Sequence, residues 1–156
     1  MKEVVTMLQN YRDILAPVDG SKNAEKALQE AVLIAQRNGA RLEILNVIDI
    51  RNFTNAFGSM MDMNGDLVYA TFNSVEEYLK KLKKEIAVKS AFKAVRIHAR
   101  FGSPRVVIAS DFLKDYPIDL IVMGKTGSNP VERFLMGSVS DYVVRNARCD
   151  VIIVRK

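Results

Sequence analysis

Residues 13–48 read DILAPVDGSKNAEKALQEAVLIAQRNGARLEILNVI and contain a complete strand–helix–strand pattern. Asp13–Val18 is an apolar run typical of a strand that is buried on both faces. Ser21 is a suitable N-cap, and apolar residues then recur at helical spacing until Gly39, a residue type that often follows the last turn of a helix. Arg41–Ile48 predicts a second strand, so we expect a parallel pair joined by a helical crossover.

The same alternation continues to the end of the chain. The further expected helices are Val75–Ile86, Ser103–Tyr116 and Val139–Ala147, and the further expected strands are Val95–Phe101, Ile118–Met123 and Val151–Val154. Strands that alternate with helices predict an α/β fold with an open, five-stranded parallel sheet covered by helices on both faces. We expect residues 1–156 to form one domain of this kind.

The composition excludes several classes of protein. Lys and Arg outnumber Asp and Glu by 23 to 18, for a formal charge of +5, and the densest cluster of this charge is Lys80–Lys84. That cluster fits the solvated face of a helix better than a nucleic-acid surface, because no aromatic residue is placed to stack on bases. No signal peptide or membrane-spanning run is visible, so we expect a cytoplasmic protein with neither membrane nor nucleic acid as partner.

Cysteine and histidine are also informative. The single cysteine, Cys149, cannot form an internal disulfide and is expected to be a small apolar residue beside a strand. The single histidine, His98, excludes most zinc sites and has no visible nucleophilic partner, so we predict an ordinary strand residue. We expect no catalytic residue and no metal site made of protein ligands.

The residues that follow the predicted strands suggest a binding site. In open α/β sheets, ligands bind beyond the carboxyl ends of the strands where the strand order reverses. Pro17 lacks the amide that a central strand needs, which indicates that the first strand separates there from a neighbour. Gly124 and Gly127 follow the fourth strand, and Gly137-Ser138 begins the last helix. Their backbone amides could together cradle a chain of phosphates.

Each of these features has a structural alternative. Asp19 could contact a ligand or could cap the turn that follows the first strand. Gly124 and Gly127 could serve only a turn with positive φ, and Ser138 with Asp141 matches a capping box. The chain has no dinucleotide fingerprint, no P-loop and no nucleophile elbow, which disfavours those three kinds of site.

The connection from Asp49 to Asp66 is unusually long and contains Phe53, Phe57 and three methionines. A connection of this length is usually functional or disordered. It could tuck its apolar groups onto the domain, cover a ligand, or present a surface to an unknown protein partner.

Taken together, Asp13–Ser21, Asn46–Asp49 and Gly124-x-x-Gly127-x9-Gly137-Ser138 resemble the universal stress protein family, specifically its ATP-binding branch. The resemblance implies strand order 3-2-1-4-5, a homodimer, and binding of ATP with Mg²⁺ bridging the phosphate oxygens. The residues that it places around the nucleotide are Pro17, Val18, Asp19, Val47, Met123, Gly124, Lys125, Thr126, Gly127, Gly137, Ser138, Val139 and Ser140.

Two positions depart from the family pattern. Asn46 stands where many members carry a histidine, and Thr126 stands where a histidine or arginine is common, while Lys125 supplies a nearby positive charge. With no visible general base, we predict a stress-response regulator that binds ATP and hydrolyses it slowly or not at all. The alternatives are a weak ATPase and a stress-protective dimer that binds no nucleotide.

The implied strand order also places Val151–Val154 at an edge of the sheet. An exposed apolar edge invites pairing with another chain unless it is covered. We therefore expect a homodimer through this strand, whereas a monomer would rely on Arg155 and Lys156 to protect the edge.

Overall fold

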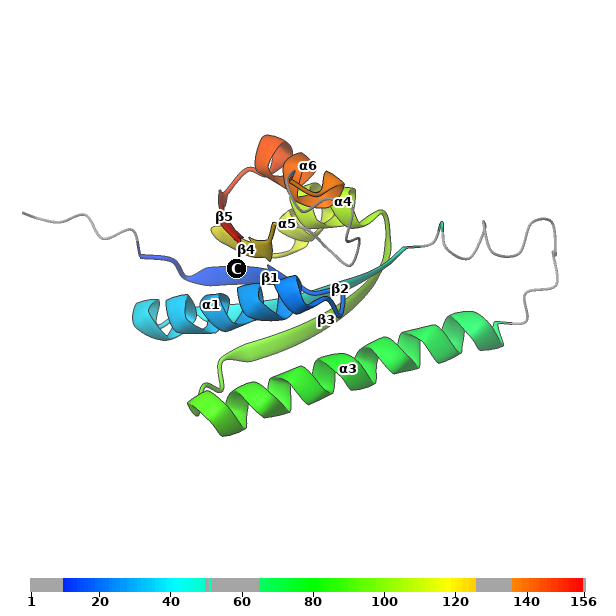
Figure 1. Cartoon of the computed structure of the whole chain (residues 1–156), viewed down its shortest axis with the longest axis horizontal. Coiled ribbons are helices and arrows are strands. Elements are labelled where there is room, and N and C mark those ends of the chain that lie inside the picture. Colours follow the sequence, from blue (N-terminus) through cyan, green and yellow to red (C-terminus); the bar gives the residue numbers. More distant parts are fainter. Residues whose placement is uncertain (1–9, 50, 52–64, 126–135, 156) are drawn as a thin grey trace, which may run out of the picture.

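The computed structural model describes residues 10–49, 51, 65–125 and 136–155 (Figure 1). Its elements are β1 (Asp13–Pro17), α1 (Lys22–Asn38), β2 (Arg41–Asp49), α3 (Asp66–Ser90), β3 (Val95–Gly102), α4 (Pro104–Val106), the π-helical turn η1 (Val107–Asp111), α5 (Phe112–Asp115), β4 (Leu120–Gly124), α6 (Ser138–Asn146) and β5 (Asp150–Val154). The strands form a five-stranded parallel sheet in the order β3-β2-β1-β4-β5. This confirms the fold class and the strand order expected from the sequence.

Two apolar cores lie on opposite faces of the sheet. Figure 1 shows α1 and α3 on one face and the helices from α4 to α6 on the other. Successive residues of β1 alternate between these cores: Ile14 packs in the first with α1, and Leu15 packs in the second with Phe112, each fully buried. Cys149 borders the second core, where burial raises the pKa of its thiol to about 11, as suits an apolar role.

Local capping explains the limits of α1. The Ser21 hydroxyl oxygen accepts a hydrogen bond from the Ala24 amide, 3.2 Å away, which confirms Ser21 as the N-cap. Gly39 ends the helix in the left-handed conformation with φ 62°, and its amide bonds back into the last turn. None of the described helices is long and apolar enough to cross a membrane.

Two helices differ from the sequence expectations. The helix expected over Ser103–Tyr116 is divided by the π-helical turn η1, which brings Val107, Ile108 and Ala109 together into the second core. Helix α3 begins at Asp66, well before the apolar pattern from Val75 that indicated it. The additional turns carry fewer buried residues, which is why periodicity did not show them.

Gly124 allows two elements to approach closely at the end of β4. It is not among the described glycines with positive φ, so the alternative explanation of Gly124 by a left-handed turn does not apply. A Cβ at Gly124 would instead lie 2.9 Å from both the carbonyl carbon and the carbonyl oxygen of Asn23, in the first turn of α1. The absence of a side chain therefore lets α1 pack onto β4.

We predict that Gly124→Ala lowers the free energy of unfolding by about 1–3 kcal/mol, because the methyl group would force α1 away from the sheet. Urea unfolding of the two proteins measures the loss. Gly65→Ala is the control, since a Cβ there meets nothing within 4 Å and should change stability by less than about 0.5 kcal/mol. Equal stability of wild type and Gly124→Ala would contradict the packing argument.

Candidate functional site

The strands β1 and β4 separate near their carboxyl ends. β1 pairs with β2 as far as Pro17–Leu45, but its pairing with β4 stops at Leu15–Ile121. The Val18 amide donates to the Leu45 carbonyl over 2.8 Å, so the chain still follows β2 beyond the strand. Because successive amides point to alternate sides of a strand, the Pro17 nitrogen faces β4, where no ladder bond remains to be made. The proline thus marks the separation, as the sequence indicated.

The turn after β1 is closed by its own side chain. One carboxylate oxygen of Asp19 accepts a hydrogen bond from the Ser21 amide over 2.9 Å, and the intervening Gly20 has φ 81°. The capping role that the sequence left open for Asp19 is therefore present. The carboxylate is exposed, so this role does not bury it.

Asn46 links β2 to the same turn, a role that sequence reasoning missed. Its side-chain amide donates to the Val18 carbonyl over 3.0 Å, at the point where β1 has ended. The next residue, Val47, is half-buried and borders the second core. Two predicted site residues, Val18 and Val47, thus lie near the carboxyl ends of two neighbouring strands, β1 and β2.

Lys125 connects the end of β4 to the start of α6. Its carbonyl oxygen accepts the Gly137 amide at 2.9 Å and the Ser140 hydroxyl at 2.6 Å, while its own amide donates to the Val154 carbonyl at 3.0 Å. Lys125, the first residue after β4, therefore lies against the first turn of α6. The Gly137 amide is already used in this connection, however, which argues against the expectation that it binds phosphate.

Gly137 rather than Ser138 is the N-cap of α6. The capping box that was the alternative interpretation of Ser138 and Asp141 is therefore absent, and Asp141 forms an ion pair with Arg145 at 3.0 Å. Ser138 is exposed at the first helical position. The amides of a helix's first turn have no intrahelical acceptor and carry partial positive charge, so this end of α6 can receive an anion.

The remaining predicted residues divide into two groups. Met123 and Gly124 are buried at the carboxyl end of β4, beside the place where β1 leaves that strand. Thr126 and Gly127 lie outside the described residues. The described part of the chain contains no group of three or more His, Cys, Asp or Glu side chains that could hold a metal ion.

A buried acid–histidine pair lies elsewhere, within the sheet. The Glu43 carboxylate on β2 is 1% exposed and lies 2.7 Å from Nε2 of His98 on β3, with Arg96 at 3.7 Å. The imidazole ring also packs against the rings of Phe112 and Tyr116 in T-shaped arrangements. The only sign of this pair in the sequence was a single glutamate, Glu43, within the apolar run Arg41–Ile48. The pair sits mid-strand, away from the carboxyl ends, so we assign it a structural role.

Comparison with known proteins identifies the family. The model of the universal stress protein family matches residues 10–155, nearly the whole chain. The chain belongs to the universal stress protein family. A relative from Staphylococcus epidermidis that is named for the family is 42% identical over 146 residues, which cover 94% of this chain and 85% of the relative.

Solved structures agree with this universal stress protein fold. The universal stress protein UspA from Lactobacillus plantarum is 34% identical with a TM-score of 0.76, covering 94% of this chain and 99% of that one. A universal stress protein from Archaeoglobus fulgidus, solved in complex with dAMP, has 24% identity and a TM-score of 0.61, covering 92% and 98% of the two chains. At that identity the second likeness shows the fold alone.

For this universal stress protein we predict that Ser140→Ala lowers the free energy of unfolding by about 1–2 kcal/mol, because it removes the buried hydroxyl that joins Lys125 to Gly137. Thermal or urea unfolding measures the change. Ser74→Ala is the matched control: its exposed hydroxyl bonds only to Ala70 within α3, and its loss should cost less than about 0.5 kcal/mol. Equal effects of the two substitutions would refute the special role of Ser140.

Proposed function

We propose that this protein is a regulatory module that binds an adenine nucleotide, ATP with Mg²⁺, and hydrolyses it slowly or not at all. The observation that carries the proposal is the bond network of Lys125, which holds the first turn of α6 beside the end of β4. The amides of Ser138, Val139 and Ser140 in that turn are the donors for the phosphates.

The strand ends suit the base and ribose. Val18, Val47 and Met123 offer apolar groups at the carboxyl ends of three neighbouring strands, the kind of surface on which a purine ring packs. Asp19 presents an exposed carboxylate beside them, which can accept hydrogen bonds from ribose hydroxyls. Pro17 leaves the β4 side of the opening without a competing backbone donor.

Lys125 adds positive charge near the proposed phosphate position, and Gly124, Thr126 and Gly127 belong to the same proposed segment. Mg²⁺ prefers oxygen ligands and keeps several waters, so phosphate oxygens are its natural partners. We therefore propose that Mg²⁺ binds together with the nucleotide.

Binding is favoured over efficient hydrolysis. A general base must reach the attacking water, and His98 is engaged with Glu43 in the middle of the sheet. A weak ATPase is one alternative function, and multiple-turnover release of phosphate would reveal it.

A stress-protective dimer that binds no nucleotide is the second alternative function. Mass spectrometry of small molecules released from the purified protein separates it from the two nucleotide-binding functions. The dAMP complex of the Archaeoglobus fulgidus protein supports the nucleotide proposal by analogy of fold.

The proposal is tested with Ser138→Asp. An added carboxylate at the first helical position favours α6, so the stability of the free protein should be equal or higher. The same charge should repel the phosphates and raise the dissociation constant for ATP by about tenfold or more, with adenosine little affected. Isothermal titration calorimetry measures the dissociation constants of ATP and adenosine. In a separate unfolding experiment, a hundredfold excess of ATP over its dissociation constant should raise the free energy of unfolding of wild type by about 2.7 kcal/mol.

Ser74→Asp is the control, because this exposed serine lies on α3 and should leave the affinity for ATP unchanged. If ATP, ADP and AMP do not raise the melting temperature of the wild-type protein, the proposed function is wrong. An unchanged affinity of Ser138→Asp for ATP would show that α6 does not contact the phosphates.

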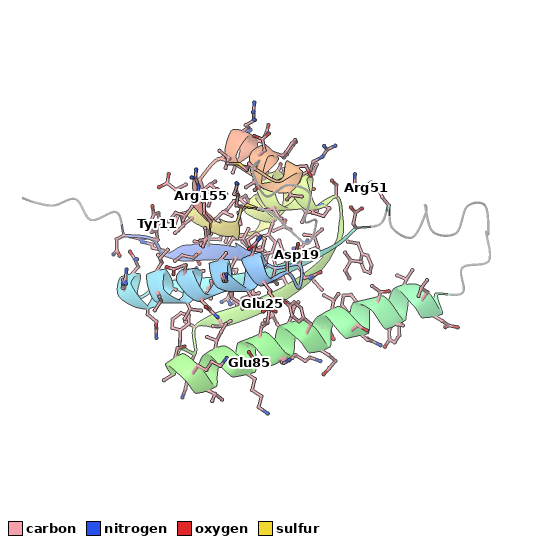
Figure 2. The ribbon with its side chains drawn as sticks, viewed as in Figure 1. Tyr11, Asp19, Glu25, Arg51, Glu85 and Arg155 are labelled. Atoms are coloured by element: carbon pink, nitrogen blue, oxygen red, sulfur yellow. The ribbon has the colours of Figure 1, made fainter. Side chains whose placement is uncertain are left out.

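We further propose a homodimer through β5, which is an edge strand with one neighbour, β4. Its central side chain, Ile152, is 36% exposed, an apolar group on an otherwise open edge. Pairing of β5 with its copy about a twofold axis would cover this edge. In the monomeric alternative the edge is protected by Arg155, at the end of this strand in Figure 2, and by Lys156, which lies outside the described residues.

A protein partner could dock near the connection 49–66. Most of that connection lies outside the described residues, but its end, Gly65, lines an apolar hollow of about 500 Å³ with Val68, Tyr69, Phe72 and Phe101. The rings of Phe72 and Phe101 stack there at 6.0 Å. The hollow is consistent with the partner-facing role that the sequence suggested for this connection.

We predict that Ile152→Arg converts a dimer into a monomer at micromolar concentration, because a charged side chain would have to be buried in the paired edge. Size-exclusion chromatography with light scattering measures the mass. Val88→Arg, at an exposed apolar position on α3, which packs against β2 and β3 on the other side of the sheet, should remain dimeric. A monomeric wild type, or a dimeric Ile152→Arg, would overturn the proposed interface.

A further inference from the structure

Arg105, in the first turn of α4, is held against Tyr142 of α6. Cζ of its guanidinium group lies over the tyrosine ring, 5.4 Å from the ring centroid, which is the range of a cation–π contact. Helices α4 and α6 lie side by side on the same face of the sheet (Figure 1). The stacking therefore fixes a positive charge that begins on one helix and rests on the other.

Tyr142 places this charge near the beginning of α6. The tyrosine follows Ser138, the first residue of the helix, by four positions, so the two side chains lie on one face of α6, one turn apart. Long side chains on a helix lean towards its N-terminus, so the ring of Tyr142 lies over the turn that begins at Ser138. The guanidinium of Arg105 is thus beside the turn whose amides are the proposed phosphate donors.

The same face of the sheet carries the apolar part of the proposed site. Met123 belongs to the second core and Val47 borders it, and this core lies under α4 to α6. Helix α4 follows the carboxyl end of β3 and also contacts β2, the strand that carries Val47. A ligand on these strand ends therefore has the first turn of α4 as a neighbour as well as the first turn of α6.

The guanidinium of Arg105 is open to a ligand. Arg105 is exposed and forms no ion pair with another residue in the described part of the chain. Arg100, by contrast, pairs with Asp115 at 2.9 Å. Arg145 pairs with Asp141 at 3.0 Å. Stacking uses one face of a guanidinium and leaves the N–H groups on its edges for other partners, and their fork geometry matches two oxygens of a phosphate.

We propose that Arg105 binds the phosphate chain of the nucleotide and makes the site prefer ATP to AMP. The amides of α6 hold the chain from one side and the guanidinium from another. This inference rests on the proposed nucleotide binding and deepens it, because it assigns the preference among adenine nucleotides to a residue outside the glycine motif.

The preference follows from charge and geometry together. A cation gains more from a ligand that carries more negative charge, and ATP carries two more phosphates than AMP. Water and salt screen a charge at an exposed site, so the attraction alone is weak. A guanidinium that is already oriented by Tyr142 adds directed hydrogen bonds, which lose less of their strength to ordering of the side chain.

The test is Arg105→Gln, with calorimetric titration of ATP with Mg²⁺, of AMP and of adenosine. We expect the dissociation constant for ATP to rise roughly tenfold, which corresponds to the loss of a hydrogen bond between charged groups. The dissociation constant for AMP should rise less, and that for adenosine should not change. The melting temperature of the free variant should stay close to that of wild type, because the side chain is exposed.

Tyr142→Leu tests the stacking separately from the charge. It keeps Arg105 but removes the ring that orients it, so the affinity for ATP should fall. Tyr142→Phe keeps a ring and should bind ATP more tightly than Tyr142→Leu. Equal affinities of these two variants would show that the ring does not position Arg105, which would overturn the inference.

Arg148→Gln is the matched control, since it removes the same charge from an exposed arginine beyond the other end of α6. Its affinity for ATP should remain close to that of wild type. If Arg105→Gln binds ATP as tightly as wild type, or loses no more affinity than Arg148→Gln, the role of Arg105 is overturned while the proposed function stands. If wild type binds no adenine nucleotide, the proposed function and this inference fall together.

Discussion

The central strand β1 divides its backbone hydrogen bonds unequally between two neighbours, and the rest of the molecule depends on that division. It follows β2 beyond its own end but keeps β4 only as far as Leu15–Ile121. Buried backbone groups need partners, and Pro17 removes one donor where β4 no longer accepts it. The separation of β1 from β4 is therefore built into the strand itself, and α1 and α6 both begin beside it.

Lys125 holds three elements together at that end of the sheet. Through its two backbone groups it contacts β5 and the N-cap of α6, and the Ser140 hydroxyl shares its carbonyl. The first-turn amides of α6 are thus placed by main-chain bonds, so the proposed phosphate site would need little ordering to bind an anion. A binding site arranged in advance loses less free energy on association than one that must form around its ligand.

The sequence was sufficient wherever a residue's role depended on near neighbours in the chain. Ser21 and Gly39 limit α1 through contacts within one turn, and both were predicted. Gly137 was missed as a cap because its choice over Ser138 depends on Lys125. The packing of Gly124 on Asn23 and the pairing of Glu43 with His98 likewise join distant segments. No local pattern contains such information, whereas the resemblance to a family supplied the strand order.

Helix α3 is longer than the sheet that supports it. Its 25 residues extend over roughly 38 Å, and its fully packed side chains, Leu79 and Leu82, both lie in the C-terminal half. The N-terminal turns project past the strands in Figure 1. Few apolar contacts oppose their opening, so their amides should exchange with solvent by local fraying while the sheet stays folded. This universal stress protein thus has a segment of low local stability that contacts the sheet through Phe72, whose ring stacks on Phe101 near the end of β3.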